Sequence, residues 1–200
     1  MLTTTWRNGW DYVGVFILGV IAGYILPRFM LHLRRYETVK DIPETCFEQN
    51  ATFRGQVVAV SDGDTFRVRH VPFFRGAGSY DGKMTDHTLQ IRLAGIDTPE
   101  LPHFGRECQP YAREAKAWLE SAIKGATVTI QLLRRDQYGR AVCMVTQGTW
   151  PFTKNLSDEL LKVGLAKVYR LSGAVYGGRL DLFNALEAQA KQARLNVWSL

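Results

Sequence analysis

Hydrophobic positions follow three patterns along the chain, and the first is an apolar run near the N-terminus. Residues 12–26 read YVGVFILGVIAGYIL and hold no charged side chain. The run is shorter than the ~20 residues that a spanning helix needs, but the apolar residues 29–33 extend it if Arg28 snorkels to the membrane surface. The pattern therefore predicts a short tail over residues 1–11 and a transmembrane anchor over residues 12–33.

Basic residues around this run predict the orientation of the anchor. Before the run the only basic residue is Arg7, whereas four follow it, namely Arg28, Arg34, Arg35 and Lys40. Because positive charge stays on the cytosolic or matrix side of a membrane, we expect the C-terminal part of the chain on that side. Two alternatives fit less well: a cleaved signal peptide would show an Ala-x-Ala site, and a helix of a soluble core would show a polar face.

The second pattern is an alternation of apolar and polar residues, which is typical of strands. In residues 88–96, for example, Leu89, Ile91 and Leu93 fall on one face. Turn residues such as Asp62-Gly63 separate neighbouring stretches. Five strands are expected, over residues 53–61, 64–71, 88–96, 127–135 and 141–147.

The third pattern is helical spacing. Three helices are expected, over residues 107–123, 155–164 and 179–198. Ser157 is the expected N-cap of the second helix, and the first lies between the third and fourth strands, as in an OB-type barrel. The predicted fold class is therefore α+β, a five-stranded OB-type β-barrel with three helices over residues 51–200. The polar, aperiodic residues 34–50 predict a linker between this domain and the anchor.

The composition adds two weaker indications. A net charge of +6 and a pI of about 9.3 suit a polyanionic partner or a membrane surface. The three cysteines, Cys46, Cys108 and Cys143, are odd in number and lack CxxC spacing. They therefore predict free thiols in a reducing compartment.

Three clusters of polar residues at the ends of the expected strands carry the candidate chemistry. They are Asp62 to Thr65, Arg92 with Asp97 to Glu100, and Asp136 to Arg140. If the first three strands form a meander, Asp64 and Asp97 can meet, and their hard oxygens suit Ca²⁺ or Mg²⁺. A cation alone would repel Arg92 and Arg140, but a phosphate can bridge a metal and guanidinium groups. The pattern therefore indicates metal-assisted cleavage of a phosphodiester, with Glu100 free to activate water.

Each cluster also has a simpler interpretation when it is taken alone. Asp62-Gly63 is a common hairpin turn, and the stretch from Asp97 to Glu100 is typical of a helix N-terminus. Asp136 to Arg140 would form a turn with a surface ion pair, and Arg92 would keep a strand edge soluble. Their joint occurrence, in this order, favours the chemical interpretation.

The chain also resembles the staphylococcal nuclease (thermonuclease) family. Five motifs between about Phe53 and Trp198 carry the resemblance: SDGDTFRV, RLAGIDTPE, DQYGRAV, LLKVGLAKVY and LEAQAKQARLNVWS. The apolar run and the phrase HFGRECQPYAREAKAWL are similar to a membrane-anchored mitochondrial branch in fungi, described as probable Ca²⁺-dependent endonucleases. The resemblance implies an anchored mitochondrial enzyme that hydrolyses phosphodiester bonds in DNA and/or RNA.

The family pattern also implies how the cofactor and the attacking water would be held. Asp64 and Asp97 would bind Ca²⁺ through their carboxylates, and Thr98 through its backbone carbonyl. Glu100 would act as general base or would position the water.

Other matching residues would serve the substrate. Arg92 and Arg140 would grip the phosphate and stabilise the transition state. Asp62 would support the metal ligands, and Tyr138 would shape the site beside Arg140. The role of Tyr169 stays open.

The sequence departs from the secreted enzymes of this family in its anchor, in its early end after the last helix, and in an insertion around Phe73–Asp86. We expect this insertion near the mouth of the barrel, where it would limit which nucleic acids enter. Two other functions stay open on sequence alone: a non-catalytic module that binds nucleic acid, and an accessory subunit of a mitochondrial membrane complex.

Overall fold

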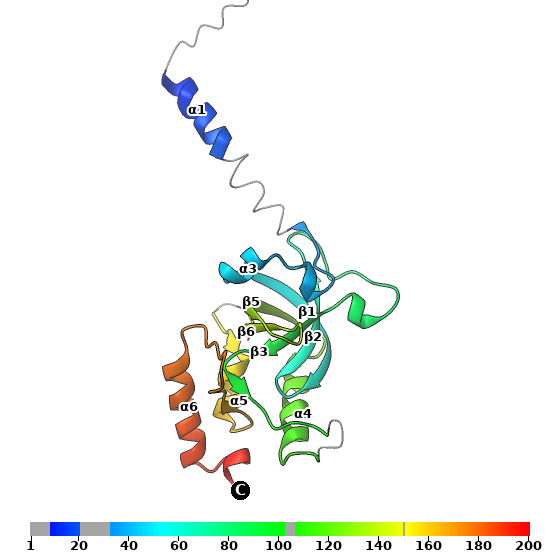
Figure 1. Ribbon diagram of the computed structural model, residues 1–200, viewed down its shortest axis with the longest axis vertical. Coiled ribbons are helices and arrows are strands. Elements are labelled where there is room, and N and C mark those ends of the chain that lie inside the picture. Colours follow the sequence, from blue (N-terminus) through cyan, green and yellow to red (C-terminus); the bar gives the residue numbers. More distant parts are fainter. Residues whose placement is uncertain (1–8, 21–32, 103–106, 150) are drawn as a thin grey trace, which may run out of the picture.

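The computed structural model describes residues 9–20, 33–102, 107–149 and 151–200 (Figure 1). Within those ranges, no helix is both long enough and apolar enough to cross a membrane. Helix α1 (Gly9–Val20) has 12 residues, and residues 21–32 of the expected anchor lie outside the described residues. An anchor over residues 12–33 therefore stays a prediction.

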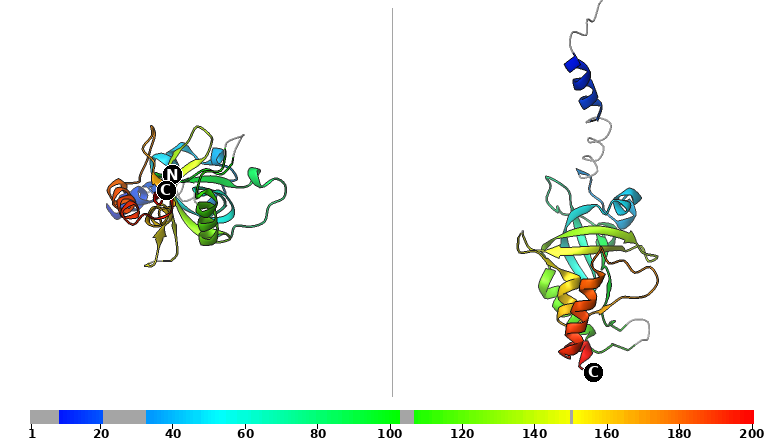
Figure 2. Two further views of the ribbon diagram at one scale, coloured as in Figure 1. Left: turned by 90° about the horizontal axis from the view of Figure 1, so that it is seen from below. Right: turned by 90° about the vertical axis from the view of Figure 1, so that its left-hand side faces the viewer.

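The folded domain is built on a strongly curved sheet (Figures 1 and 2). Its main strands are β1 (Thr52–Asp62), β2 (Thr65–Val71), β3 (Leu89–Leu93), β5 (Thr127–Arg135) and β6 (Ala141–Gln147). Neighbours pair in the order β3-β2-β1-β5-β6, and β3 also pairs with β6 in a parallel ladder. The expected α+β, OB-like fold is confirmed, and four of the five expected strands begin and end within one residue of their predicted bounds.

The third expected strand, over residues 88–96, is in fact two strands. Gly95 has a φ of +73°, a left-handed conformation that interrupts the strand. Glycine is needed at this position because a Cβ would lie 2.5 Å from a ring carbon of Phe183. The chain resumes as β4 (Ile96–Asp97), which pairs with β8 (Lys167–Val168) in a small separate sheet. Another two-residue strand, β7 (Lys154–Asn155), extends the main sheet beside β6.

The three expected helices are present but shorter than predicted: α4 (Ala112–Ile123), α5 (Leu156–Lys162) and α6 (Leu180–Gln192). Helix α4 begins late because Tyr111 has a left-handed backbone, with a φ of +69°. The N-cap of α5 is Asn155, whose side chain accepts from the Ser157 and Asp158 backbone N–H groups. The prediction that Ser157 caps this helix is therefore wrong, and its hydroxyl instead donates to the carbonyl of Ala94. After α6, the left-handed residues Arg194 and Asn196 lead into a 3-10 turn, η4 (Asn196–Trp198).

Residues 36–50 correct the prediction of a linker over residues 34–50. They form a 3-10 turn, η2 (Val39–Asp41), and the short helix α3 (Glu44–Glu48), which packs on β5. Their apolar side chains are buried in the main core: Tyr36, Val39, Ile42 and Phe47. The guanidinium of Arg135 donates to the carbonyl of Ile42 at 2.8 Å. The segment therefore belongs to the folded domain. Its mostly polar sequence did not reveal the four apolar side chains that are buried.

Candidate active site

A cleft of about 1140 Å³ opens on one side of the curved sheet. It is lined by the ends of β1 and β2, by β3 and β4, by the β5–β6 turn and by residues 169–175. Its volume exceeds the roughly 300–1,000 Å³ that is typical of small-molecule pockets, so it has room for a stretch of polymer. Residues 72–87, all of them described, contribute no side chain to this cleft. The insertion therefore does not border this cleft, and its expected place near the mouth of the barrel stays a prediction.

The structure brings most of the predicted site residues to this cleft. Six of them line it: Asp62, Arg92, Asp97, Glu100, Tyr138 and Arg140. The other two, Asp64 and Thr98, are buried, and Asp64 contacts the cleft residue Arg92. Residues from three distant parts of the sequence thus meet at one place, as the three clusters predicted.

Arg92 is the centre of this arrangement. It lies on β3 opposite Thr65 of β2, so its guanidinium faces the carboxylate of the neighbouring Asp64. One of its nitrogens donates to Asp64, and the other donates to Asp97 Oδ1 at 2.8 Å. The two carboxylates therefore converge on one guanidinium, although 33 residues separate them in the sequence.

The environment of Asp64 is unusual for a carboxylate. Its side chain is almost fully buried, and burial raises its pKa, while the charge of Arg92 and a hydrogen bond from the Thr65 hydroxyl oppose the rise. Asp97, in contrast, is half exposed to the cleft. Asp64 is thus held by its partners out of contact with solvent, and Asp97 presents its carboxylate to the cleft.

The β1–β2 turn holds Asp64 in place through close packing at Gly63. A Cβ on Gly63 would lie 2.7 Å from the Thr98 hydroxyl and 2.8 Å from the Ala115 Cβ. Glycine is therefore needed for the turn to rest against α4. The Thr98 hydroxyl is buried and has no hydrogen-bond partner among the described residues. Asp62, on the same turn, accepts from the Gly63 N–H, and burial raises its pKa.

Arg140 is held by the turn on which it lies. Its Nε donates to Asp136 Oδ2 at 2.6 Å, and its backbone N–H donates to Asp136 Oδ1 at 2.9 Å. Its guanidinium also lies 5.3 Å from the centre of the exposed Tyr138 ring. Gly139 takes a φ of +77°, which the turn requires. These contacts hold the guanidinium of Arg140, a second cation, in the lining of the cleft that also contains Arg92.

Two contacts were missed by reasoning from the sequence. The backbone N–H of Glu100 donates to the side-chain Oε1 of Gln109 at 2.9 Å, and the Gln109 N–H donates to the Glu100 carbonyl at 3.1 Å. The pair fixes the backbone at Glu100, whose exposed side chain lines the cleft. The second contact is between Arg92 and Tyr169: the guanidinium lies 5.6 Å from the centre of the Tyr169 ring. Tyr169 therefore lies beside an arginine that is a candidate for binding phosphate.

The donor set fits a hard divalent cation only in part. The carboxylates of Asp64 and Asp97 converge and are oxygen donors of the kind that Ca²⁺ prefers. Among the described residues, however, no group of three His, Cys, Asp or Glu side chains could hold a metal. A cation here would need carbonyl, water or substrate oxygens in addition, which suits a metal that binds together with a phosphate.

Comparisons with known proteins agree with this geometry. The family model for staphylococcal nuclease homologues matches residues 90–200. Endonuclease Htp3 of Saprolegnia parasitica is 50% identical over 192 residues, which cover 96% of this chain and 91% of that protein. Probable endonuclease lcl3 of Pyrenophora tritici-repentis is 38% identical over 193 residues, which cover 91% and 70%. Probable endonuclease LCL3 of Candida dubliniensis is 39% identical over 178 residues, which cover 84% and 76%. The chain therefore belongs to the family of staphylococcal nuclease homologues.

Proposed function

We propose that this protein is a Ca²⁺-dependent endonuclease that hydrolyses phosphodiester bonds in DNA and/or RNA. The observation that carries the proposal is the convergence of Asp64, Asp97, Arg92, Arg140 and Glu100 on one cleft. The printed names of several relatives, which call them endonucleases or probable endonucleases, support the same activity. The size of the cleft and the positive net charge of the chain suit a polyanionic polymer.

The two arginines would bind the scissile phosphate. Both guanidinium groups are already oriented by carboxylates, Arg92 by Asp64 and Asp97, and Arg140 by Asp136. A planar guanidinium donates two parallel hydrogen bonds to phosphate oxygens and stabilises the charge that builds up on them. Because this orientation exists before substrate binds, little reorganisation would be needed in the reaction.

Glu100 would act on the attacking water. Its carboxylate is exposed in the cleft and its backbone is fixed by Gln109. A carboxylate placed within hydrogen-bond reach of a water can orient it and accept its proton.

The proposed cofactor site consists of the Asp64 and Asp97 carboxylates and the backbone carbonyl of Thr98. Bound Ca²⁺ would supply positive charge that neutralises the phosphate. Asp64 suits this role because a buried carboxylate gains from a second positive neighbour besides Arg92.

The test is cleavage of single-stranded and double-stranded DNA and RNA by the full-length protein. We expect cleavage in Ca²⁺ and none in EGTA. Glu100→Gln should lower kcat by roughly 10²–10⁴, the usual weight of a general base, with less change in Ca²⁺ affinity. Asp64→Ala should raise the Ca²⁺ concentration that gives half of the maximal rate. Glu114→Gln, an exposed glutamate on α4, is the matched control and should leave the rate unchanged.

Either of two results would contradict this assignment: equal cleavage in EGTA, or a Glu100→Gln variant as fast as the wild type. If the wild type cleaves nothing with any divalent cation, the alternatives of an accessory subunit or a non-catalytic binding module take its place.

A further inference from the structure

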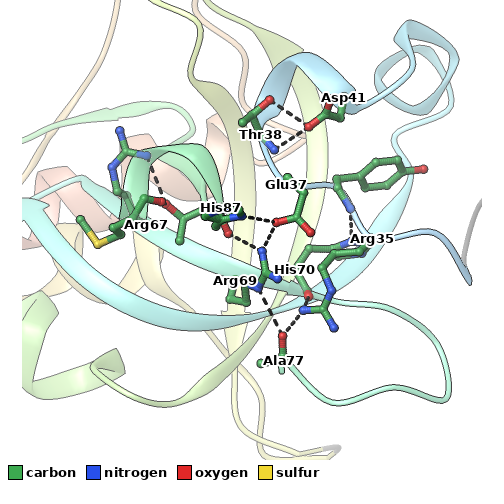
Figure 3. Close-up of polar contacts among 12 residues, drawn as sticks. Arg35, Glu37, Thr38, Asp41, Arg67, Arg69, His70, Ala77 and His87 are labelled. Atoms are coloured by element: carbon green, nitrogen blue, oxygen red, sulfur yellow. Dashed lines mark hydrogen bonds and ion pairs between the residues drawn. The ribbon is translucent and has the colours of Figure 1, made fainter. Parts of the chain in front are cut away.

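The insertion after β2 is tied to the residues that follow the apolar N-terminal run. The Arg35 guanidinium donates to the carbonyls of His70 at 3.1 Å and Gly76 at 2.9 Å, and also to that of Ala77 (Figure 3). Figure 1 shows the loop between β2 and β3 on the upper part of the domain, away from the C-terminus. The insertion and residues 34–37 therefore form one continuous surface.

A second set of contacts makes this junction rigid. Arg69 of β2 donates to the carboxylate of Glu37 and to the carbonyl of His87 at 2.8 Å (Figure 3). His87 Nδ1 lies 3.1 Å from the same Glu37 carboxylate, and the His87 ring stacks on Tyr80. Both ends of the insertion are thus fixed to the segment that leads to the apolar run.

The insertion displays two large apolar side chains that are not needed for packing the core. Phe73 is 57% exposed and Phe74 is 83% exposed, and their rings meet edge to face at 4.5 Å. Phe74 has a φ of +63°, which is a strained conformation for a bulky residue. A fold that holds an aromatic pair outward on a strained backbone indicates a contact surface.

Positive charge accompanies this aromatic pair. Arg75 directly follows Phe74 in the sequence and is exposed, and so is Arg34, which precedes the junction residue Arg35. Burial and the charges of Arg69 and Arg75 lower the pKa of Arg35, so these cations are close enough to repel each other. Glu37 is the carboxylate that the described contacts place among them. The exposed arginines beside the pair therefore suit an anionic surface.

The position of the apolar run indicates which anionic surface this is. The uncharged stretch ends at Leu26, nine residues before Arg35, and a chain of that length spans at most about 30 Å. A bilayer that takes up residues 12–26 would lie within that distance of the insertion. Aromatic rings and arginines are the side chains that are enriched at membrane interfaces.

We propose that Phe73, Phe74, Arg75 and Arg34 form a lipid-facing surface that rests on an anionic bilayer. This contact is additional to any membrane insertion of the N-terminal run. It would hold the folded domain in one orientation relative to the bilayer. It is also independent of the chemistry proposed for the cleft, because none of these residues lines the cleft.

The test uses the full-length protein in nanodiscs of phosphatidylcholine with phosphatidylserine, in which part of the phosphatidylcholine carries a photoactivatable group. After illumination, cross-linked peptides are mapped by mass spectrometry. We expect cross-links on residues 72–76, and a fall to about a tenth with Phe74→Ser, which removes the inserted ring. Arg75→Gln should lower them by about fivefold, the weight of one basic residue near an anionic surface.

Phe152 supplies the matched control, because it is also 83% exposed but lies on the β6–β7 connection. Phe152→Ser should leave the cross-links on residues 72–76 unchanged. Cross-links confined to the N-terminal run would overturn the proposal, and so would equal labelling of residues 72–76 in discs of pure phosphatidylcholine. Thermal unfolding of each variant separates loss of contact from loss of fold, since these exposed side chains should not lower the melting temperature.

Discussion

At the scale of single residues, the position of Glu100 depends on Gln109, which does not itself reach the cleft. Removing its side chain in Gln109→Ala leaves the Glu100 backbone held by one hydrogen bond instead of two. An exposed hydrogen bond is worth about 1 kcal/mol, so we expect kcat to fall about fivefold. KM should change little, because the arginines that bind the phosphate are untouched. Steady-state kinetics on one oligonucleotide measures both constants.

Two further variants show whether Gln109 acts by positioning Glu100. Gln109→Glu keeps an acceptor oxygen at the same reach and should recover most of the lost kcat. Gln192→Ala removes an exposed glutamine at the end of α6 and should change neither constant. If Gln109→Ala raises KM and leaves kcat unchanged, Gln109 does not position the water-activating carboxylate.

The difference between Gln109 and the other site residues shows what a sequence reveals about a site. Asp64, Arg92 and Arg140 stand at strand ends beside glycine-containing turns, so their positions follow from local patterns. Gln109 lies nine residues from its partner, in a stretch for which the sequence predicted a helix but which precedes the observed start of α4 at Ala112. Such a contact depends on how a loop folds back, which alternation and spacing do not encode.

At the scale of elements, Glu187 of helix α6 connects this helix to β8 by accepting a hydrogen bond from the Val168 N–H. Burial alone would raise the pKa of this carboxylate, but hydrogen bonds from Arg170, Lys191 and the Val168 N–H lower it to about 2. A lowered pKa means that the ionised form stabilises the fold. This stabilisation is complete above the ordinary pKa of about 4.5 and is lost as the pH falls toward about 2.

We therefore expect Glu187→Gln to lower the free energy of unfolding at pH 7 by about 1–3 kcal/mol, the usual weight of hydrogen bonds to charged groups. The difference from the wild type should shrink near pH 3, where the wild type begins to lose the same contribution. Urea denaturation at both pH values measures it. Glu120→Gln, which removes an exposed partner of Lys124, should have nearly no effect at either pH. A difference that grows at low pH would contradict the role given to Glu187.

Long strands could be predicted from the sequence, and strands of two residues could not. Strands β5 and β6 have nine and seven residues and occur where expected. Strands β4 and β8 have two residues each and exist only because they meet across the fold. Residues 36–50 were misread for a related reason: their buried side chains follow the shape of the β5 surface rather than a helical or strand period.

At the scale of the whole molecule, membrane attachment stays a prediction of the apolar run. We expect the full-length protein to remain in the membrane pellet during alkaline carbonate extraction, because residues 12–33 reach the length of a spanning helix when Arg28 lies at the membrane surface. Protease added to intact mitochondria should not reach Arg140 if the basic flank lies on the matrix side. Release into the supernatant would rule out a spanning anchor, and digestion of the domain would rule out the matrix side.

The extent of the folding unit is a separate question, because residues 34–50 are packed on the sheet. A fragment that begins at residue 51 loses four buried side chains, Tyr36, Val39, Ile42 and Phe47, and exposes the β5 surface that they cover. Fully burying such side chains is worth about 1.5–3 kcal/mol each, and the entropy of ordering the segment offsets part of the total. We expect the fragment of residues 51–200 to unfold roughly 3–6 kcal/mol more easily than the fragment of residues 34–200. Urea denaturation of the two fragments at pH 7 measures the difference. Equal stability would mean that the segment is the linker that its polar sequence first indicated, and that the junction with the insertion contributes nothing to holding the domain in place.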